Sequence, residues 1–135
     1  MKCPKCSGAL SRIEAAYGST VERCDSCQGV FVGVGALDML QREWFLWPRS
    51  DPSTIDAGDP RIGKRLDTIA DIDCPGCGVR MLPISVKDQQ HIWLERCPGC
   101  GGVFFDAGEL TDLRYKTLAD WVRSYLKGPR SAPGA

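Results

Sequence analysis

The cysteines are the residues in this sequence whose type and spacing could do chemistry. The chain has eight cysteines among 135 residues, and all of them fall into Cys-x-x-Cys pairs: Cys3/Cys6, Cys24/Cys27, Cys74/Cys77 and Cys97/Cys100. Seventeen residues separate the first two pairs, and 19 residues separate the last two. Both gaps match four-cysteine zinc sites, in which each turn places two sulfurs on one side of the ion. We therefore predict two structural zinc ions (Zn2+), each held by four cysteines.

Prolines and glycines in and beside these pairs suit the same kind of turn. Proline stiffens three of the four pairs, at Pro4, Pro75 and Pro98. The turn needs a residue that takes a positive φ soon after its second cysteine, and five glycines are candidates for it: Gly8, Gly29, Gly78, Gly101 and Gly102. A unit this small buries too little apolar surface to fold alone, so we expect the metal to supply much of its stability.

Two other chemistries of paired cysteines stay open. The Cys-Pro-Gly-Cys-Gly runs that begin at Cys74 and Cys97 also look like the iron-binding turns of rubredoxin, and tetrahedral sulfur sites suit iron as well as zinc. A thioredoxin-like dithiol would belong beside a βαβ pattern, which the sequence lacks. A colourless, redox-silent protein with two zinc ions would exclude both alternatives.

The cysteines belong to a repeat, because the sequence is one unit of roughly 45 residues written twice. Residues 29–31 (Gly-Val-Phe) correspond to residues 102–104. Between the cysteine pairs of each copy, we expect a β-hairpin, with strands over 9–15 and 21–23 and over 79–86 and 91–96. The predicted fold class is a small zinc-stabilised α+β fold of two tandem zinc ribbons, each followed by an α-helix.

Each helix has its own sequence signals. The second is expected to begin at Asp106, with Glu109 three residues on as in a capping box, and to run to about Lys127. The first is expected to end before Pro48 and to carry one apolar stripe: Leu37, Leu40, Trp44 and Trp47. The expected domains are a first ribbon and helix (1–47), a linker with one short helix (48–73), a second ribbon and long helix (74–128), and a disordered tail (129–135).

The motif of the second copy resembles that of the transcription-factor-IIB-type zinc-ribbon family. It matches the family pattern at ten positions: Cys74, Cys77, Cys97, Cys100, Gly102, Phe104, Asp106, Gly108, Glu109 and Leu110. The first copy keeps eight of them: Cys3, Cys6, Cys24, Cys27, Gly29, Phe31, Gly35 and Leu37. It departs at Gly33 and Ala36, where the family has Asp and Glu, so the first helix lacks a capping box. The resemblance implies a zinc ribbon and, through the family's name, a role in transcription.

Charge and composition narrow the function classes. Lysine plus arginine equals aspartate plus glutamate, 17 each, so no overall charge draws the chain to nucleic acid or to an anionic membrane. Apolar stretches are far too short to span a membrane, and the N-terminus has no secretory signal, so we expect a cytoplasmic protein.

The sequence favours a non-enzymatic protein. His91 is the only histidine, and a closed four-cysteine site needs no further ligand, so we expect it on the hairpin surface. Asp106 and Glu109 are better explained by the start of a helix than by acid–base catalysis.

Two surfaces are candidates for binding a macromolecule. The first helix carries apolar residues outside its stripe, which predict a protein partner or self-association: Met39, Phe45 and Leu46. The second helix and the tail carry basic residues that could contact phosphates: Arg114, Lys116, Arg123, Lys127 and Arg130. Balanced charge makes protein–protein contact the first hypothesis and nucleic-acid or transcription-complex binding the second, with redox chemistry third.

Overall fold

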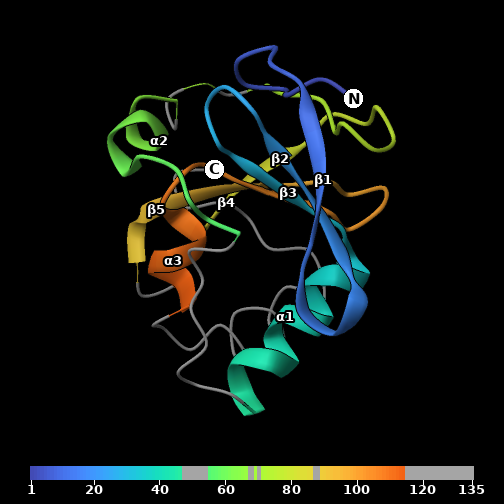
Figure 1. Ribbon diagram of the computed structural model, residues 1–135. Coiled ribbons are helices and arrows are strands. Elements are labelled where there is room, and N and C mark those ends of the chain that lie inside the picture. Colours follow the sequence, from blue (N-terminus) through green and yellow to red (C-terminus); the bar gives the residue numbers. More distant parts are fainter. Residues whose placement is uncertain (47–54, 67–68, 70, 87–88, 115–135) are drawn as a thin grey trace.

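The computed structural model describes residues 1–46, 55–66, 69, 71–86 and 89–114 of the chain. Within them, the strands form one antiparallel sheet of six strands in the order β1-β2-β3-β6-β5-β4 (Figure 1). The sheet therefore consists of three strands from each copy of the repeat, with β3 and β6 in the middle. Among the described residues, no helix is long and apolar enough to cross a membrane.

The two copies have matching elements. The first copy has β1 (Leu10–Glu14), β2 (Thr20–Cys24), β3 (Val30–Val32) and α1 (Val34–Leu46), with a 3-10 turn at Ala16–Gly18 inside the hairpin. The second copy has β4 (Leu82–Val86), β5 (Gln89–Arg96), β6 (Val103–Phe105) and α3 (Glu109–Arg114). The short helix α2 (Pro60–Leu66) lies between them in the sequence. The predicted continuation of the second helix to Lys127, like the predicted tail, lies outside the described residues.

The third strand of each copy was not predicted. β3 and β6 are three residues long and buried at every position, so they show no alternation of polar and apolar residues. These strands join the two ribbons, because Phe31 of β3 lies opposite Phe104 of β6 in the antiparallel register. The two phenylalanines are equivalent positions of the repeat, so the ribbons are related by a local two-fold axis between them.

The central strands divide the interior into two clusters. Val30 and Val32 of β3 face one cluster, whereas Phe31 faces the other, as expected from the two-residue period of a strand. The first cluster lies under α1 and α3, through Leu37, Leu40 and Leu110, and Figure 1 shows both helices on this side of the sheet. The second cluster, on the other side of the sheet, surrounds the cysteines and receives Ile62 and Leu66 of α2: Cys3, Cys24, Cys27, Phe31, Ile72, Cys74, Met81, Cys97 and Phe104.

The segment expected as a linker (48–73) packs on the ribbons where the structure describes it. Ile55 and Asp56 are each only 6% exposed. Gly58 fits between Gln28 and Ala107, because a Cβ on Gly58 would lie 2.5 Å from the Cβ of Gln28 and 2.7 Å from that of Ala107. This segment therefore contributes to the packed interior as well as connecting the two copies.

Candidate metal centres

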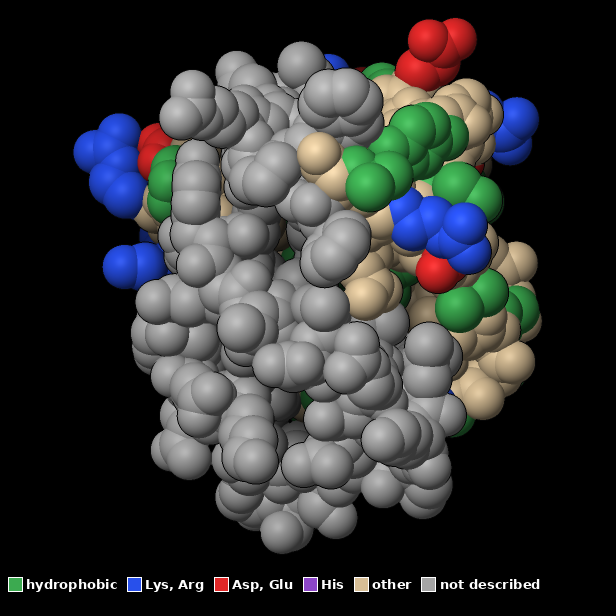
Figure 2. Space-filling model, turned by 90° about the horizontal axis from the view of Figure 1, so that it is seen from below, with side chains coloured by type: hydrophobic (Ala, Val, Ile, Leu, Met, Phe, Trp, Pro, Cys, Tyr) green, Lys and Arg blue, Asp and Glu red, His purple; other side chains and the backbone are tan. Residues whose placement is uncertain are grey.

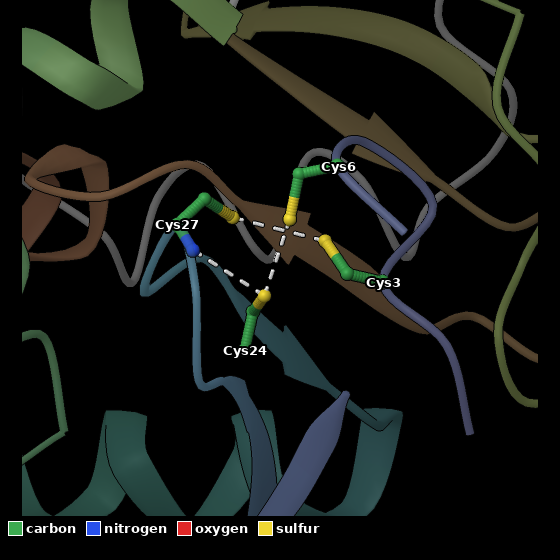
Figure 3. Close-up of side chains that lie close together, drawn as sticks. All are labelled: Cys3, Cys6, Cys24 and Cys27. Atoms are coloured by element: carbon green, nitrogen blue, oxygen red, sulfur yellow. Dashed lines mark hydrogen bonds between the residues drawn. The ribbon is translucent and has the colours of Figure 1, made fainter. Parts of the chain in front are cut away.

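The first centre gathers four sulfur atoms from two turns. Cys3 and Cys6 lie before β1, Cys24 ends β2, and Cys27 lies in the turn that follows it. The Sγ atoms of Cys3 and Cys27 are 3.7 Å apart and those of Cys6 and Cys24 are 3.3 Å apart, and all four sulfurs lie within 4.8 Å of one another (Figure 3).

The second centre repeats this arrangement. The Sγ atoms of Cys74 and Cys100 are 3.7 Å apart and those of Cys77 and Cys97 are 3.2 Å apart, again with all four within 4.8 Å. In each centre the first cysteine of one pair faces the second cysteine of the other pair.

These distances fit tetrahedral zinc. A zinc–sulfur bond of about 2.3 Å gives a sulfur–sulfur edge of about 3.8 Å in a tetrahedron, close to the longer contacts in both centres. The contacts are much longer than a disulfide bond of about 2.05 Å, and all eight cysteines are free. Four thiolates fill the coordination shell of zinc, so the ion would serve structure here and leave no open position for a reactant.

Burial and the neighbouring thiols shift the pKa values of the cysteines in both centres. The hydrogen bond with Cys27 lowers the pKa of Cys3 to about 5, whereas the same contact raises the pKa of Cys27. Burial raises the pKa of Cys74 in the second centre to about 12. Zinc binds the thiolate form of cysteine, so its binding would release protons from the thiols whose pKa is raised, and acid would weaken it.

The prediction that glycines take the positive φ in the cysteine turns is correct only in part. Gly78 and Gly101 take a positive φ of 78°, each just after the second cysteine of its pair. In the first ribbon, the expectation for Gly8 and Gly29 was wrong, because Ser7 and Gln28 take the positive φ of 64° one residue earlier. The prediction assumed that the glycines take the positive φ. Gly8 and Gly29 are needed instead because a Cβ at either position would clash with neighbouring side chains.

Gly102 also does not take a positive φ, and it is needed because it lies against an aromatic ring. A Cβ on Gly29 would lie 2.6 Å from Cζ of Phe104, and a Cβ on Gly102 would lie 2.5 Å from Cζ of Phe31. Each phenylalanine therefore packs against the turn that follows the second cysteine pair of the opposite ribbon. This exchange of rings follows the local two-fold axis.

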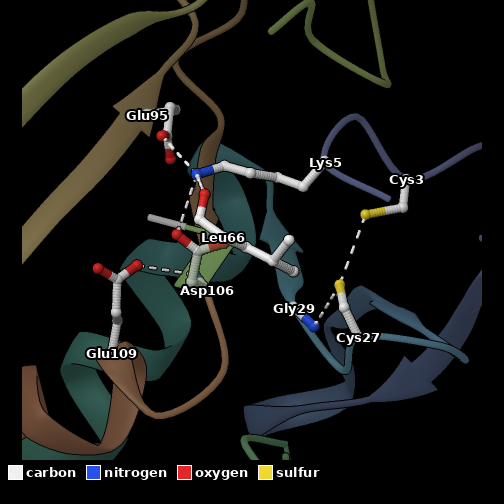
Figure 4. Close-up of polar contacts among 8 residues, drawn as sticks. All are labelled: Cys3, Lys5, Cys27, Gly29, Leu66, Glu95, Asp106 and Glu109. Atoms are coloured by element: carbon white, nitrogen blue, oxygen red, sulfur yellow. Dashed lines mark hydrogen bonds and ion pairs between the residues drawn. The ribbon is translucent and has the colours of Figure 1, made fainter. Parts of the chain in front are cut away.

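A buried lysine ties the first centre to the second ribbon. Lys5 lies between Cys3 and Cys6 in the sequence, and its Nζ is 2.8 Å from Oε1 of Glu95 and 3.0 Å from Oδ2 of Asp106 (Figure 4). The same ammonium donates to the carbonyl oxygen of Leu66 at 3.0 Å. Burial opposes the charge on Lys5, but attraction by the two carboxylates outweighs it and raises the pKa of Lys5. This network was not predicted, although the sequence shows a lysine inside a cysteine pair and the Asp of the family motif.

The start of α3 is capped by two acidic residues. Glu109 accepts a hydrogen bond at 2.7 Å from the N–H of Asp106, which is the backward contact of a capping box. The carboxylate of Asp56 accepts from the N–H groups of Gly108 and Thr111 at 2.8 Å, and from the Thr111 hydroxyl. Asp56 is 52 residues from Gly108 in the sequence, so no local pattern could have identified it.

The two centres differ in exposure. In the first, only Cys6 is exposed, whereas in the second both Cys77 and Cys100 are exposed. Cys27 and Cys100 are equivalent positions, so the difference arises from what covers them.

The other candidate residues are placed only in part. Met39 of α1 is half-buried against the first cluster, and Leu46 is 61% exposed. The side chains of Phe45, His91 and Arg114 lie outside what the structure describes, and so do the other basic residues expected on the second helix and the tail: Lys116, Arg123, Lys127 and Arg130.

Comparison with known proteins supports the metal assignment. The family model described as a transcription factor zinc-finger, of the IIB zinc-ribbon type, matches residues 2–43 and 73–114. No curated protein and no solved structure matches the chain. Each matched region includes one group of four cysteines, and the two regions cover more than half of the sequence, which confirms the predicted resemblance. The chain binds two zinc ions and belongs to the transcription-factor-IIB-type zinc-ribbon family, whose domain it contains in two tandem copies.

Proposed function

We propose that this protein is a non-enzymatic binding module, whose two zinc ions hold a surface that contacts another protein. The observation that carries the proposal is the exposure of large apolar side chains along α1. Val34, at the start of the helix, is 46% exposed and Leu46, at its end, is 61% exposed. Exposed apolar side chains next to a packed interior are the usual anchors of protein contacts.

Two opposite charges of α1 offset each other between these side chains. Asp38 and Arg42 are one helical turn apart on α1 and pair with each other at 3.1 Å. In the view from below, hydrophobic side chains reach the surface beside basic and acidic ones where the described residues form it (Figure 2). In this proposal, each ribbon presents its hairpin and the helix that follows to the partner.

Nucleic-acid binding is the second candidate function. Three basic residues of α2 are exposed and could contact phosphates: Arg61, Lys64 and Arg65. Arg61 pairs with Asp59 at 3.1 Å, which reduces the positive field of this small group. Redox chemistry remains a distant third, and it would require iron or a dithiol in place of zinc.

The experiment is affinity capture with matched baits. The zinc-loaded chain, the Leu46→Glu variant and the Leu82→Glu variant are compared, because Leu82 is an exposed leucine (46%) on β4, an edge strand of the sheet and not part of α1. We expect one protein partner to be retained by the natural chain and by Leu82→Glu, and to be lost with Leu46→Glu.

Binding to labelled DNA and RNA at low and at moderate salt separates the two functions. Phosphate contacts weaken steeply with salt, whereas an apolar contact does not. Nucleic-acid binding that collapses with salt and falls with Arg61→Ala and Lys64→Ala would favour the second candidate over the first.

A further inference from the structure

The two zinc centres differ in the side chains that their cysteine turns carry. The position just before the second cysteine of each pair is the one that differs consistently. The first ribbon has Lys5 and Ser26 at its two such positions, whereas the second ribbon has Gly76 and Gly99. The second centre therefore lacks two side chains that the first centre has.

Both of these side chains protect the first centre. The Lys5 ammonium is buried in its network with the second ribbon, which fixes the turn that carries Cys6. A Cβ on Gly8 would lie 2.7 Å from Oγ of Ser26 and 2.9 Å from Sγ of Cys24, so this hydroxyl and this sulfur are neighbours. Cys24 is the buried cysteine that faces Cys6. The one exposed sulfur of the first centre therefore faces a sulfur that is covered.

Glycine leaves the sulfurs of the second centre open. A Cβ on Gly99 would lie 3.5 Å from Sγ of Cys77 and 3.6 Å from Sγ of Cys97, so a side chain at this position would cover both sulfurs. With glycine there, both Cys77 and Cys100 are exposed. A small solute can therefore reach two sulfurs of this centre from the solvent.

Each exposed sulfur of the second centre faces a buried one. The Sγ of Cys77 lies 3.2 Å from that of Cys97, and the Sγ of Cys100 lies 3.7 Å from that of Cys74. Cys74 and Cys97 are buried. The sulfurs of each of these two contacts need to approach by only about 1–2 Å to reach the disulfide bond length of about 2.05 Å.

We propose that the second centre is a reaction site for hydrogen peroxide, which oxidises its four thiolates to two disulfides, Cys77–Cys97 and Cys74–Cys100, and thereby releases its zinc ion. Oxidants attack accessible thiolates first, so the first centre reacts later. The inference goes beyond the proposed function, because it assigns a reaction to one centre whatever the partner of the protein is.

Each disulfide consumes one peroxide molecule. The exposed thiolate attacks one peroxide oxygen, so that an S–O bond forms, the O–O bond breaks and hydroxide leaves. The buried thiolate then attacks the sulfur of this sulfenic acid, so that an S–S bond forms, the S–O bond breaks and a second hydroxide leaves. Two electrons thus pass from the two sulfurs to the peroxide.

The metal takes no part in this electron transfer. Zinc has no redox chemistry, and it is bound by thiolates, so the ion is released as Zn2+ once the thiolates have become disulfides. The reaction therefore differs from electron transfer through bound iron. It is stoichiometric, so it does not make the protein an enzyme.

The test treats the zinc-loaded full chain with hydrogen peroxide, stops the reaction with catalase, counts the bound ions by native mass spectrometry and maps the disulfides by tandem mass spectrometry. We expect one zinc ion to be lost about tenfold faster than the other, with the disulfides Cys77–Cys97 and Cys74–Cys100. Cys3 and Cys27 should stay reduced in this one-zinc species. A dithiol reductant with added Zn2+ should restore the two-zinc form.

Two matched variants exchange the cover between the ribbons. Gly99→Ser gives the second ribbon the residue of the first, and its Cβ would press only on the exposed side chain of Val79, at 3.2 Å. Ser26→Gly makes the opposite change. We expect Gly99→Ser to slow the loss of the second zinc about threefold or more, and Ser26→Gly to speed the loss of the first by a similar factor. Gly35→Ser, where a Cβ has no neighbour within 4 Å, should change neither rate.

Four results would overturn the proposal. They are equal rates of zinc loss from the two centres, zinc loss without disulfides, oxidation of Cys77 and Cys100 to sulfinic acid in place of disulfides, and rates that neither Gly99→Ser nor Ser26→Gly changes. None of these results depends on the partner that affinity capture identifies, so this reaction can fail while the proposed function stands.

Discussion

The two zinc ribbons share one motif and one sheet, but among the described residues only one of their two equivalent junctions is covered. The first junction lies between the first zinc centre (Lys5, Gln28) and the start of α3 (106–108), and the second lies between the second zinc centre (Gly76, Gly101) and the start of α1 (33–35). At the first junction, Cys27 and Ala107 are buried and Gly58 of the connecting segment packs on Ala107, whereas the equivalent Cys100 and Val34 are exposed. The centre of the sheet is nearly symmetric, since Phe31 and Phe104 exchange rings across the axis. The repeated motif gives a symmetric sheet, whereas the single connecting segment makes the two junctions different.

The same comparison explains why the first copy departs from the family pattern. Asp106 faces Lys5 across the first junction, so a buried acid there is matched by a buried base. At the second junction both members are glycine, with Gly76 in place of the lysine and Gly33 in place of the aspartate. A buried carboxylate without its cation would be costly, so the loss of the lysine and the loss of the acid belong together.

Removing the metal should have the largest effect. Structural zinc contributes about 10–16 kcal/mol in zinc-finger peptides, so excess chelator is expected to unfold the chain, as followed by far-UV circular dichroism. The comparison predicts an order of loss, because Cys77 and Cys100 are exposed and only Cys6 is exposed in the first centre. Native mass spectrometry should show a one-zinc species, in which Cys77 and Cys100 are alkylated first. Earlier alkylation of Cys3 and Cys27 would contradict this order.

Breaking the buried ion pair should come next. Lys5→Met leaves Glu95 and Asp106 facing each other without the ammonium, at an expected cost of about 3–5 kcal/mol in the free energy of unfolding. The matched control is Gly76→Lys at the exposed equivalent position, with an expected change within about 0.5 kcal/mol. Urea denaturation of the zinc-loaded variants measures both. Equal effects would mean that the two junctions are alike.

The ion pair also predicts a pH dependence. The pKa of Lys5 is raised in the folded state, so its stabilising effect is complete below the ordinary lysine value of 10.5 and is lost as the pH rises through the folded value. The difference in stability between the natural chain and Lys5→Met should therefore stay constant from pH 7 to about pH 10. A difference that shrinks over that range would contradict the ion pair.

The glycines at the centre of the sheet should respond equally in the two ribbons. Gly29→Ala and Gly102→Ala each push a Cβ into a buried phenylalanine ring, at an expected cost of about 1–3 kcal/mol. Gly35→Ala, where the described residues leave open space within α1, should instead be neutral or stabilise by up to about 1 kcal/mol. Thermal unfolding of the zinc-loaded proteins gives the comparison. A large difference between the two central variants would argue against the local two-fold axis.

The cap from the connecting segment should have the smallest effect. Asp56→Asn keeps the shape of the side chain but removes its charge, so we expect a loss of about 1 kcal/mol, with faster hydrogen exchange confined to the start of α3. No change in exchange at Gly108 would show that Asp56 does not hold this turn.

Local sequence patterns predicted the metal ligands but not the packing between residues far apart in the sequence. The cysteine spacing predicted the eight residues that the structure gathers into two groups, and alternation predicted the two hairpins to within a few residues. β3 and β6 were missed because three buried residues carry no period. Lys5 and Asp56 were missed because their partners lie 101 and 52 residues away, which no single-sequence pattern encodes.

Hydrogen exchange of individual amides, measured by NMR on the zinc-loaded chain, tests most directly whether the connecting segment closes only one of the two junctions. We predict slow exchange at Gly108 and Thr111, which donate to Asp56, and fast exchange at Gly35 and Ala36, which have no acceptor among the described residues. Equally slow exchange at both helix starts would show that the second junction is also closed, and would contradict the account.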